Sequence, residues 1–361
     1  MIIRAFAEGW AGAVTKTISL KGTVSPQPRL SASTRNSRRM AMQNIELLSE
    51  YDADTWVKWL GQISHNYAEP VIASIMASAD NPGEWAELAQ MTIEAGAKAV
   101  ELNVSCPHGM PERATGAFIG QDPVLTGEIT SAVREKIKAP LWVKLTPNVT
   151  DITVIGKAAI DNGADALAAI NTLSGVIGVD LESMTPMPGV GGFSTKGGIS
   201  GAAVKPIALR CVAELAKLKT PVSGMGGIRT WEDAAEFILL GAGTVQICTE
   251  VMFRGFRIIR ELVGGLEHYL EIKGFNSPDE IRGAALGKLV DFAGLPSGNK
   301  VKFFITDKCD LCGDCITSCD DGGYQAIVKG RRRAAINQKL CTKCGLCRIV
   351  CPIEAIDVIE L

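Results

Sequence analysis

The chain has 361 residues, of which 47% are hydrophobic and 21% are charged, and its formal net charge is −2. This length suffices for a barrel domain of roughly 250 residues with a smaller domain attached, and the apolar content excludes a disordered chain. The near-neutral charge provides no strong positive potential that would attract nucleic acid. No apolar run reaches the roughly 18 residues of a membrane span. Because the N-terminal residues also lack a signal-peptide layout, we expect a cytoplasmic protein that binds neither nucleic acid nor a membrane.

Short β-branched runs alternate with helix-like segments along most of the chain, which is typical of a parallel sheet wrapped by helices. The predicted strands are 12–19, 71–76, 99–105, 141–146, 166–171, 221–225 and 244–248. The predicted helices between them are 84–95, 123–137, 152–162, 204–217 and 230–240. Together they predict an α/β fold, a TIM-type (β/α)₈ barrel with one strand fewer than the eight that closure needs.

The missing barrel strand is expected before Met1, because Ile2–Glu8 has the pattern of the end of a first crossover helix. A barrel without that strand would have an unpaired edge. The periodicity becomes less regular after residue 264, and a turn-rich junction follows at 294–299. We therefore predict a barrel at 1–265, a connecting segment at 266–300 and a separate small domain at 301–361.

Eight of the eleven cysteines lie between Cys309 and Cys351, which indicates a metal site in a reducing compartment rather than disulfides. Both runs have the form C-x₂-C-x₂-C-x₃-C, the spacing of two-cluster ferredoxins, in which the fourth cysteine crosses to the other 4Fe–4S cluster. The predicted ligand sets are Cys309, Cys312, Cys315 and Cys351 for the first cluster, and Cys341, Cys344, Cys347 and Cys319 for the second. Zinc is the alternative, but its four tetrahedral ligands would leave thiols of each run idle. The first run departs from the usual pattern by carrying Asp320 where proline is common.

The catalytic groups of such barrels lie at the carboxyl ends of the strands. Cys106 ends one predicted strand, and a thiol with a pKa near 8.5 can deliver a proton at neutral pH. The alternative is an inert, packed cysteine, which is how we interpret Cys211 in its helical segment. Lys16 and Lys144 also end strands, where they are either surface ammonium groups or buried partners of an anion such as reduced flavin.

Two strand ends near the close of the barrel predict a phosphate site. Gly226 and Gly227 follow the next-to-last strand, while Cys248 and Thr249 end the last one. Backbone amides beside a helix start, together with a hydroxyl, are the expected phosphate ligands at this place in a barrel. The chain has no dinucleotide-binding glycine motif and no P-loop, so a nicotinamide donor must bind another chain. The clusters would then carry electrons singly to a flavin.

Several motifs and the paired cysteine runs together resemble the catalytic, ferredoxin-type subunits of dihydropyrimidine dehydrogenases. The motifs are 103–110, 143–150, 170–172 and 205–210. The resemblance implies an FMN contacted by Lys16, Thr17, Lys144, Asn171, Gly201, Gly226, Gly227, Cys248 and Thr249. It implies a pyrimidine pocket formed by Asn44, Asn103, Ser105, Asn171 and Thr172.

By the same resemblance, reduced FMN gives hydride to C6 of uracil or thymine and Cys106 protonates C5. The electrons come from NADH through a separate FAD-containing subunit, so the resemblance implies a hetero-oligomer. One departure is that the family's opening strand supplies a small-residue loop against the flavin, and this sequence does not contain it. Two alternatives remain open. One is a dihydroorotate dehydrogenase, against which the clusters and the pair His108-Gly109 argue, and the other is a flavin-free electron carrier with a degenerate barrel.

Overall fold

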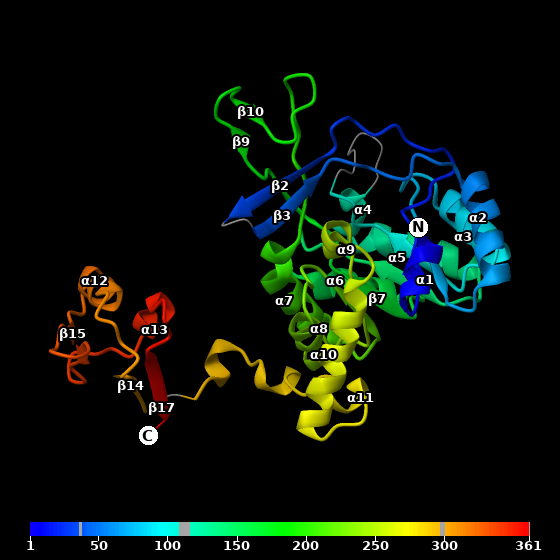
Figure 1. Ribbon diagram of the computed structural model, residues 1–361. Coiled ribbons are helices and arrows are strands. Elements are labelled where there is room, and N and C mark those ends of the chain that lie inside the picture. Colours follow the sequence, from blue (N-terminus) through cyan, green and yellow to red (C-terminus); the bar gives the residue numbers. More distant parts are fainter. Residues whose placement is uncertain (36–37, 108–115, 297–299, 361) are drawn as a thin grey trace. The chain divides into compact units, whose positions relative to one another are not determined.

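The computed structural model describes residues 1–35, 38–107, 116–296 and 300–360. The chain divides into two compact units, Met1–Leu289 and Val290–Leu361, which are drawn in Figure 1. Helix α10 (Ile258–Lys273) belongs to the first unit and continues through residue 265. Among the described residues, none of the helices combines the length and the apolar character that a membrane crossing requires.

The first unit is built on a curled sheet of seven parallel strands, a half-barrel whose spatial order follows the chain. The order is β1 (Ala13–Val14), β4 (Val71–Ile75), β5 (Ala99–Asn103), β6 (Leu141–Lys144), β7 (Ala166–Ala169), β12 (Val222–Met225) and β13 (Thr244–Gln246). All seven predicted strands are confirmed. In the described part of the chain no pairing joins β1 to β13, so the sheet has two edges instead of the closure of an eight-stranded barrel.

The helices of the first unit confirm the helical periodicity of the sequence. They are α1 (Ile2–Glu8), α2 (Ala53–Asn66), α3 (Pro82–Glu94), α5 (Pro123–Lys136), α6 (Ile152–Asp161), α7 (Lys205–Ala216), α8 (Trp231–Leu239) and α9 (Thr249–Arg254), with one-turn helices α4 (Ala117–Gly120) and α11 (Pro278–Ile281). Asp52, Asp122 and Asp151 each accept a backbone N–H at a helix start, a cap that contributes about 1 kcal/mol. Trp85 on α3 is fully buried against the sheet, and its indole N–H donates to the carbonyl of Ser78 at 2.9 Å.

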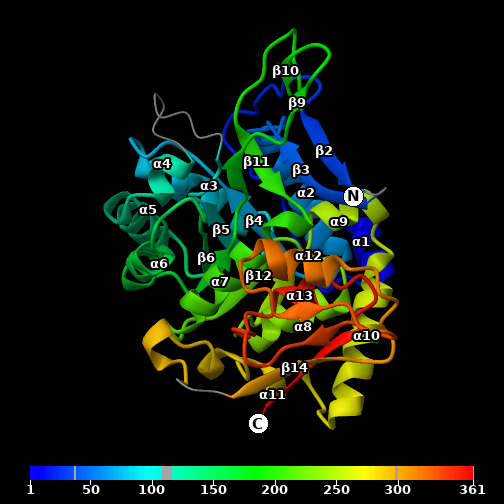
Figure 2. The same cartoon turned by 90° about the vertical axis from the view of Figure 1, so that its left-hand side faces the viewer.

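A second sheet in the first unit was not predicted. Its four antiparallel strands lie in the order β2 (Leu30–Arg35), β3 (Arg38–Asn44), β11 (Gly197–Ser200) and β8 (Leu173–Gly175). Next to it, β9 (Val179–Asp180) and β10 (Thr185–Pro186) form a hairpin that projects from the unit in both Figure 1 and Figure 2. The pairing of β3 with β11 joins segments far apart in the sequence, and it places Asn44 opposite Gly198.

The second unit is a pseudo-repeat in which each cysteine run includes a short helix and is followed by a strand. Helix α12 (Asp314–Asp321) precedes β15 (Ile327–Val328), and α13 (Leu346–Val350) precedes β17 (Ile356–Glu360). Strand β14 (Val301–Ile305) pairs with β17, and β15 pairs with β16 (Ala335–Ile336), both antiparallel. The small core of this unit consists of Phe303, Ile305, Cys315, Ile327, Ala334 and Ile356. Such a small core depends on its metal sites for much of its stability.

Candidate active site and cluster sites

Polar side chains from several strand ends meet at one edge of the parallel sheet. Asn103, at the end of β5, donates from Nδ2 to Thr17 Oγ1 at 2.8 Å. Its Oδ1 accepts from Asn171 Nδ2 at 3.0 Å and from Ser105 Oγ at 3.1 Å. Asn171 Nδ2 also donates to Ser105 Oγ at 2.9 Å. The fold therefore joins four of the predicted site residues into one hydrogen-bonded group.

Asn44 and Thr172 come close to each other across the second sheet. Asn44 Nδ2 donates to the carbonyl of Gly198 at 3.3 Å. A Cβ built on Gly198 would overlap Thr172 Oγ1 and would stand 3.1 Å from Asn44 Nδ2. The glycine thus keeps open the space between two side chains that were predicted to hold a pyrimidine.

Asn148 is a supporting residue to which the sequence analysis gave no role. Its Nδ2 donates to Thr146 Oγ1 at 2.9 Å and to the carbonyl of Thr172 at 3.1 Å, and its Oδ1 accepts from the backbone N–H of Ser174 at 2.9 Å. Asn148 therefore fixes the loop that carries Thr172. Its position just after the strand end at Lys144 was the available signal.

Cys106 lies just beyond β5 and is only 5% exposed. Its Sγ donates weakly to the carbonyl of Leu47 at 3.8 Å. The thiol thus contacts the segment that follows β3, which carries Glu46 and begins directly after Asn44. His108 and Gly109, which the sequence analysis used against a dihydroorotate dehydrogenase, lie outside the described residues.

The two predicted lysines differ in burial and in partner. Lys16 is ion-paired with Glu46, which also accepts from Arg29 Nε at 2.5 Å. Burial raises the pKa of Glu46, but the hydrogen bonds and charges of Lys16 and Arg29 outweigh it and hold the pKa below its ordinary value. The Lys16 side chain is 44% exposed, which corresponds to the surface ammonium group, one of the two alternatives that the sequence left open for this residue. Lys144 is 20% exposed, and its Nζ lies 3.6 Å from Oε1 of the fully buried Glu101.

The predicted phosphate residues also come together. Gly226 and Gly227 have φ of +121° and +85°, which favour glycine, and a Cβ at Gly227 would stand only 3.0 Å from the carbonyl oxygen of Gly201. Thr249 Oγ1 donates to Ser200 Oγ at 2.9 Å, while Cys248 is exposed at the start of α9. Backbone amides of two glycines and a hydroxyl, together with the ammonium groups of Lys16 and Lys144, fit the phosphate and the ring of a flavin mononucleotide.

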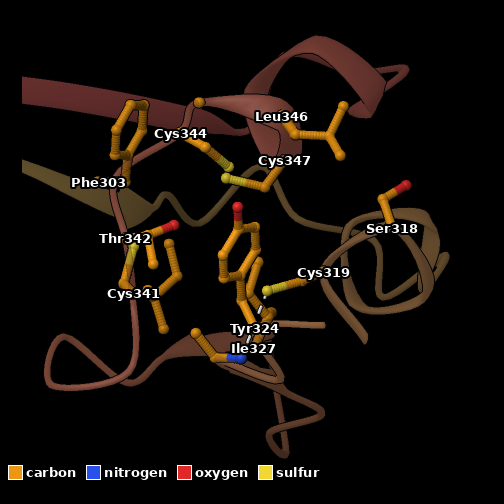
Figure 3. Close-up of a pocket in the computed structure, with 13 residues that line it drawn as sticks. Phe303, Ser318, Cys319, Tyr324, Ile327, Cys341, Thr342, Cys344, Leu346 and Cys347 are labelled. Carbon is orange, nitrogen blue, oxygen red and sulfur yellow. Dashed lines mark hydrogen bonds between the residues drawn. The ribbon is translucent and has the colours of Figure 1, made fainter. Parts of the chain in front are cut away.

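The second unit contains two hollows, each lined by four cysteines. One is lined by Cys319, Cys341, Cys344 and Cys347, and the other is lined by Cys309, Cys312, Cys315 and Cys351. Figure 3 shows Cys344 and Cys347 pointing toward one another, with Cys319 and Cys341 on either side. Each hollow therefore gathers the crossed set that the spacing assigns to one cluster.

The chemistry of these donor sets also fits iron–sulfur clusters. Burial, followed by the neighbouring Cys309, Cys312 and Cys347, raises the pKa of Cys315 to about 11, so a cationic centre is needed to hold this thiol deprotonated. The crossing cysteines Cys319 and Cys351 each accept a backbone N–H, from Ala326 at 3.3 Å and from Ala355 at 3.2 Å. Within the described ranges, no three His, Cys, Asp or Glu side chains are arranged to hold a single metal ion.

Comparisons with known families match both units. Residues 11–270 match the dihydroorotate dehydrogenase family, and residues 304–360 match the 4Fe–4S dicluster domain. A dihydroorotate dehydrogenase of Eimeria tenella, solved in complex with ferulenol, has the same fold with a TM-score of 0.65 and 21% identity, over 78% of this chain and 81% of that one. The first unit therefore belongs to an FMN-binding class of oxidoreductases, here joined to a dicluster domain.

Curated relatives narrow this class. The NAD-dependent dihydropyrimidine dehydrogenase subunit PreA of Escherichia coli K12 is 39% identical over 100% of this chain and 89% of that subunit. The chloroplastic NADP⁺ dihydropyrimidine dehydrogenase of Arabidopsis thaliana is 39% identical over 78% of this chain and 70% of that protein. The catalytic subunit of dihydroorotate dehydrogenase B from Methanosarcina acetivorans is 41% identical over 78% of this chain and 86% of that subunit. The chain belongs to the family of dihydropyrimidine dehydrogenase PreA subunits.

Proposed function

We propose that this chain is the pyrimidine-reducing subunit of an NAD-dependent dihydropyrimidine dehydrogenase, and that it reduces uracil and thymine to their 5,6-dihydro forms. The observation that carries the proposal is the hydrogen-bonded group of Asn103, Ser105 and Asn171 beside the buried thiol of Cys106. The relationship to PreA over the whole chain, including the dicluster domain, supports it.

Uracil presents ring N–H donors and carbonyl acceptors in alternation, and amide side chains carry both kinds of group. Asn44, Asn103, Ser105, Asn171 and Thr172 would bind the pyrimidine in this way. The amide of Asn171 is oriented before substrate arrives, since its Oδ1 accepts from the backbone N–H of Thr172 at 2.8 Å while its Nδ2 donates to Asn103 and Ser105. A site with oriented amides discriminates strongly against rings that lack the matching groups.

Lys16, Thr17, Lys144, Asn171, Gly201, Gly226, Gly227, Cys248 and Thr249 would hold FMN. Bound FMN supplies the hydride that adds to C6 of the pyrimidine. Cys106 holds the proton that C5 receives, so one hydride and one proton complete the two-electron reduction of the C5–C6 bond. The burial of Cys106 keeps water away from the thiol while it transfers the proton.

Electrons would reach this chain from NADH, oxidised on an FAD-containing flavoprotein subunit, and would pass singly through the two 4Fe–4S clusters. This chain would therefore work in a hetero-oligomer in the cytoplasm. Cys309, Cys312, Cys315 and Cys351 would bind one cluster, and Cys341, Cys344, Cys347 and Cys319 the other.

Dihydroorotate dehydrogenase activity is the second candidate function, favoured by the 41% identity to the dihydroorotate dehydrogenase B catalytic subunit. The two candidates differ in substrate, because dihydroorotate carries a carboxylate that uracil lacks. The anaerobically purified chain should contain one FMN and roughly eight irons, the number that two cubanes require. Uracil should then change the flavin absorption spectrum. A response to orotate alone would favour the second candidate, and irons without flavin would leave only an electron carrier.

A further inference from the structure

A fully buried carboxylate lies beneath the site on the same face of the sheet. Glu101 belongs to β5, two residues before Asn103, and residues two apart on a strand point to the same face. Its side chain is 0% exposed, and Oε1 accepts from Ser74 Oγ at 3.0 Å. Its Oε2 is buried without a hydrogen-bond partner in the described residues.

Both contacts of Glu101 Oε1 are with donors. Ser74 Oγ donates to it at 3.0 Å, and the ammonium of Lys144, which has donors and no acceptor, lies at 3.6 Å. Glu101 therefore forms the acceptor end of any hydrogen-bond chain that it joins.

Such a chain runs from Glu101 to the site. Ser74 has one hydroxyl proton and donates it to Glu101, so at 3.2 Å it must accept from Thr17 Oγ1. Thr17 has then used its own proton, so its Oγ1 accepts from Asn103 Nδ2 at 2.8 Å. Because Nδ2 of Asn103 points toward Thr17, its Oδ1 points toward Asn171 and Ser105 and accepts from both.

We propose that Glu101 is a positioning residue that orients the amide of Asn103 through Ser74 and Thr17 and neutralises Lys144 from beneath. The inference rests on the proposed function and deepens it. In Glu101→Gln, the side-chain amide can donate to Ser74, so the direction of each hydrogen bond in the chain can reverse. Asn103 would then present its donor and its acceptor to uracil in two orientations. The charge of Lys144 would also be uncompensated and would favour the anionic reduced form of a bound flavin.

The test uses the whole, FMN-loaded chain, titrated with uracil and followed by flavin absorbance. Glu101→Gln should weaken uracil binding about ten-fold, the loss expected when one well-oriented hydrogen bond is removed. It should also shift the flavin midpoint potential in the positive direction, an effect that a purely structural role would not produce. Ser74→Ala interrupts the chain but keeps the carboxylate, so it should weaken uracil binding while leaving the potential near that of the wild type.

Asp165→Asn is the matched control, because Asp165 is also an ion-paired carboxylate. It lies just before β7, at the amino ends of the strands, whereas the site lies at their carboxyl ends. Asp165→Asn should change neither the uracil affinity nor the flavin midpoint potential. Wild-type uracil affinity and potential in FMN-loaded Glu101→Gln would overturn the inference. If that variant does not fold, unchanged uracil affinity in Ser74→Ala overturns it instead. Absence of flavin or of a uracil response in the wild-type chain would count against the proposed function itself.

Discussion

The flavin-site edge of the first unit and the cluster hollows of the second are assembled in opposite ways. Thr17 and Asn103, which are hydrogen-bonded at the sheet edge, are 86 residues apart in the sequence, and Asn103 and Asn171 are 68 apart. Each cluster hollow instead takes three of its four cysteines from one short run. A cluster site is thus encoded mainly by local spacing, whereas the flavin site exists only when the parallel sheet has formed.

This difference predicts that damage to one site leaves the other intact. The largest effect is expected in the second unit. Cys312→Ser removes one ligand from a four-cysteine hollow, so iron content should fall by about half, and NADH-driven turnover with the flavoprotein partner should stop. FMN content and the spectral response to uracil should stay unchanged. Iron content equal to that of the wild type would show that Cys312 is not a ligand.

A second substitution tests the sheet edge alone. Cys106→Ala should retain FMN and all irons but lower the rate of pyrimidine reduction by at least about 100-fold, the usual contribution of a positioned acid. Cys211→Ala is the control, because Cys211 is buried in α7 and burial raises the pKa of its thiol to about 11. Turnover of Cys106→Ala close to that of the control would refute the acid role.

A smaller effect is expected at the phosphate end of the flavin site. A Cβ at Gly227 would press on the backbone N of Lys205 at 2.9 Å and the carbonyl of Gly201, so Gly227→Ala should weaken FMN retention several-fold without loss of iron. Gly274→Ala is a matched control, since its φ is also positive but no atom lies within 4 Å of the added Cβ. Equal FMN content in the two variants would argue against a phosphate site here.

The smallest effect concerns pH. The pKa of Glu46 is held below its ordinary value of 4.5, so its ion pairs with Lys16 and Arg29 stabilise the first unit fully above that pH. This stabilisation is lost as the pH falls through the lowered pKa of the folded state. Thermal unfolding of the wild type should therefore show a drop in Tm below about pH 4.5 that Glu46→Gln reduces. Identical pH profiles would contradict a contribution from Glu46.

The sequence predicts the seven strands and most helices because each has a clear hydrophobic period. It could not predict the second sheet, because β2 and β3 are rich in polar and charged residues and β3 pairs with the distant β11. Gln43 on β3 is an example, because its polar side chain suggests a surface position although it is completely buried. Its burial is explained only by the fold, in which its Oε1 accepts from the backbone N–H of Ile177 at 2.6 Å.

The candidate site was predicted unevenly for the same reason. Lys144 was predicted from its place at a strand end, whereas Asn103 and Asn171 were predicted from the family resemblance. All three follow or end strands whose carboxyl ends meet in any parallel barrel. Glu101 was missed, although it lies two residues before Asn103 on the same strand and therefore on the same face, which was the available signal. The ion pair of Lys16 with Glu46 could likewise not be predicted, because Glu46 reaches Lys16 from the segment after β3.

The crossing of Cys319 and Cys351 between the two hollows has a consequence for the order of events during synthesis. The hollow that contains Cys309, Cys312 and Cys315 is completed by Cys351, which belongs to the second run. A ribosome-bound chain that has exposed only the first run therefore offers three of the four thiols of one site and a single thiol of the other. Neither site has its full set of four thiols until the second run has emerged, so neither cluster can be completed before that point.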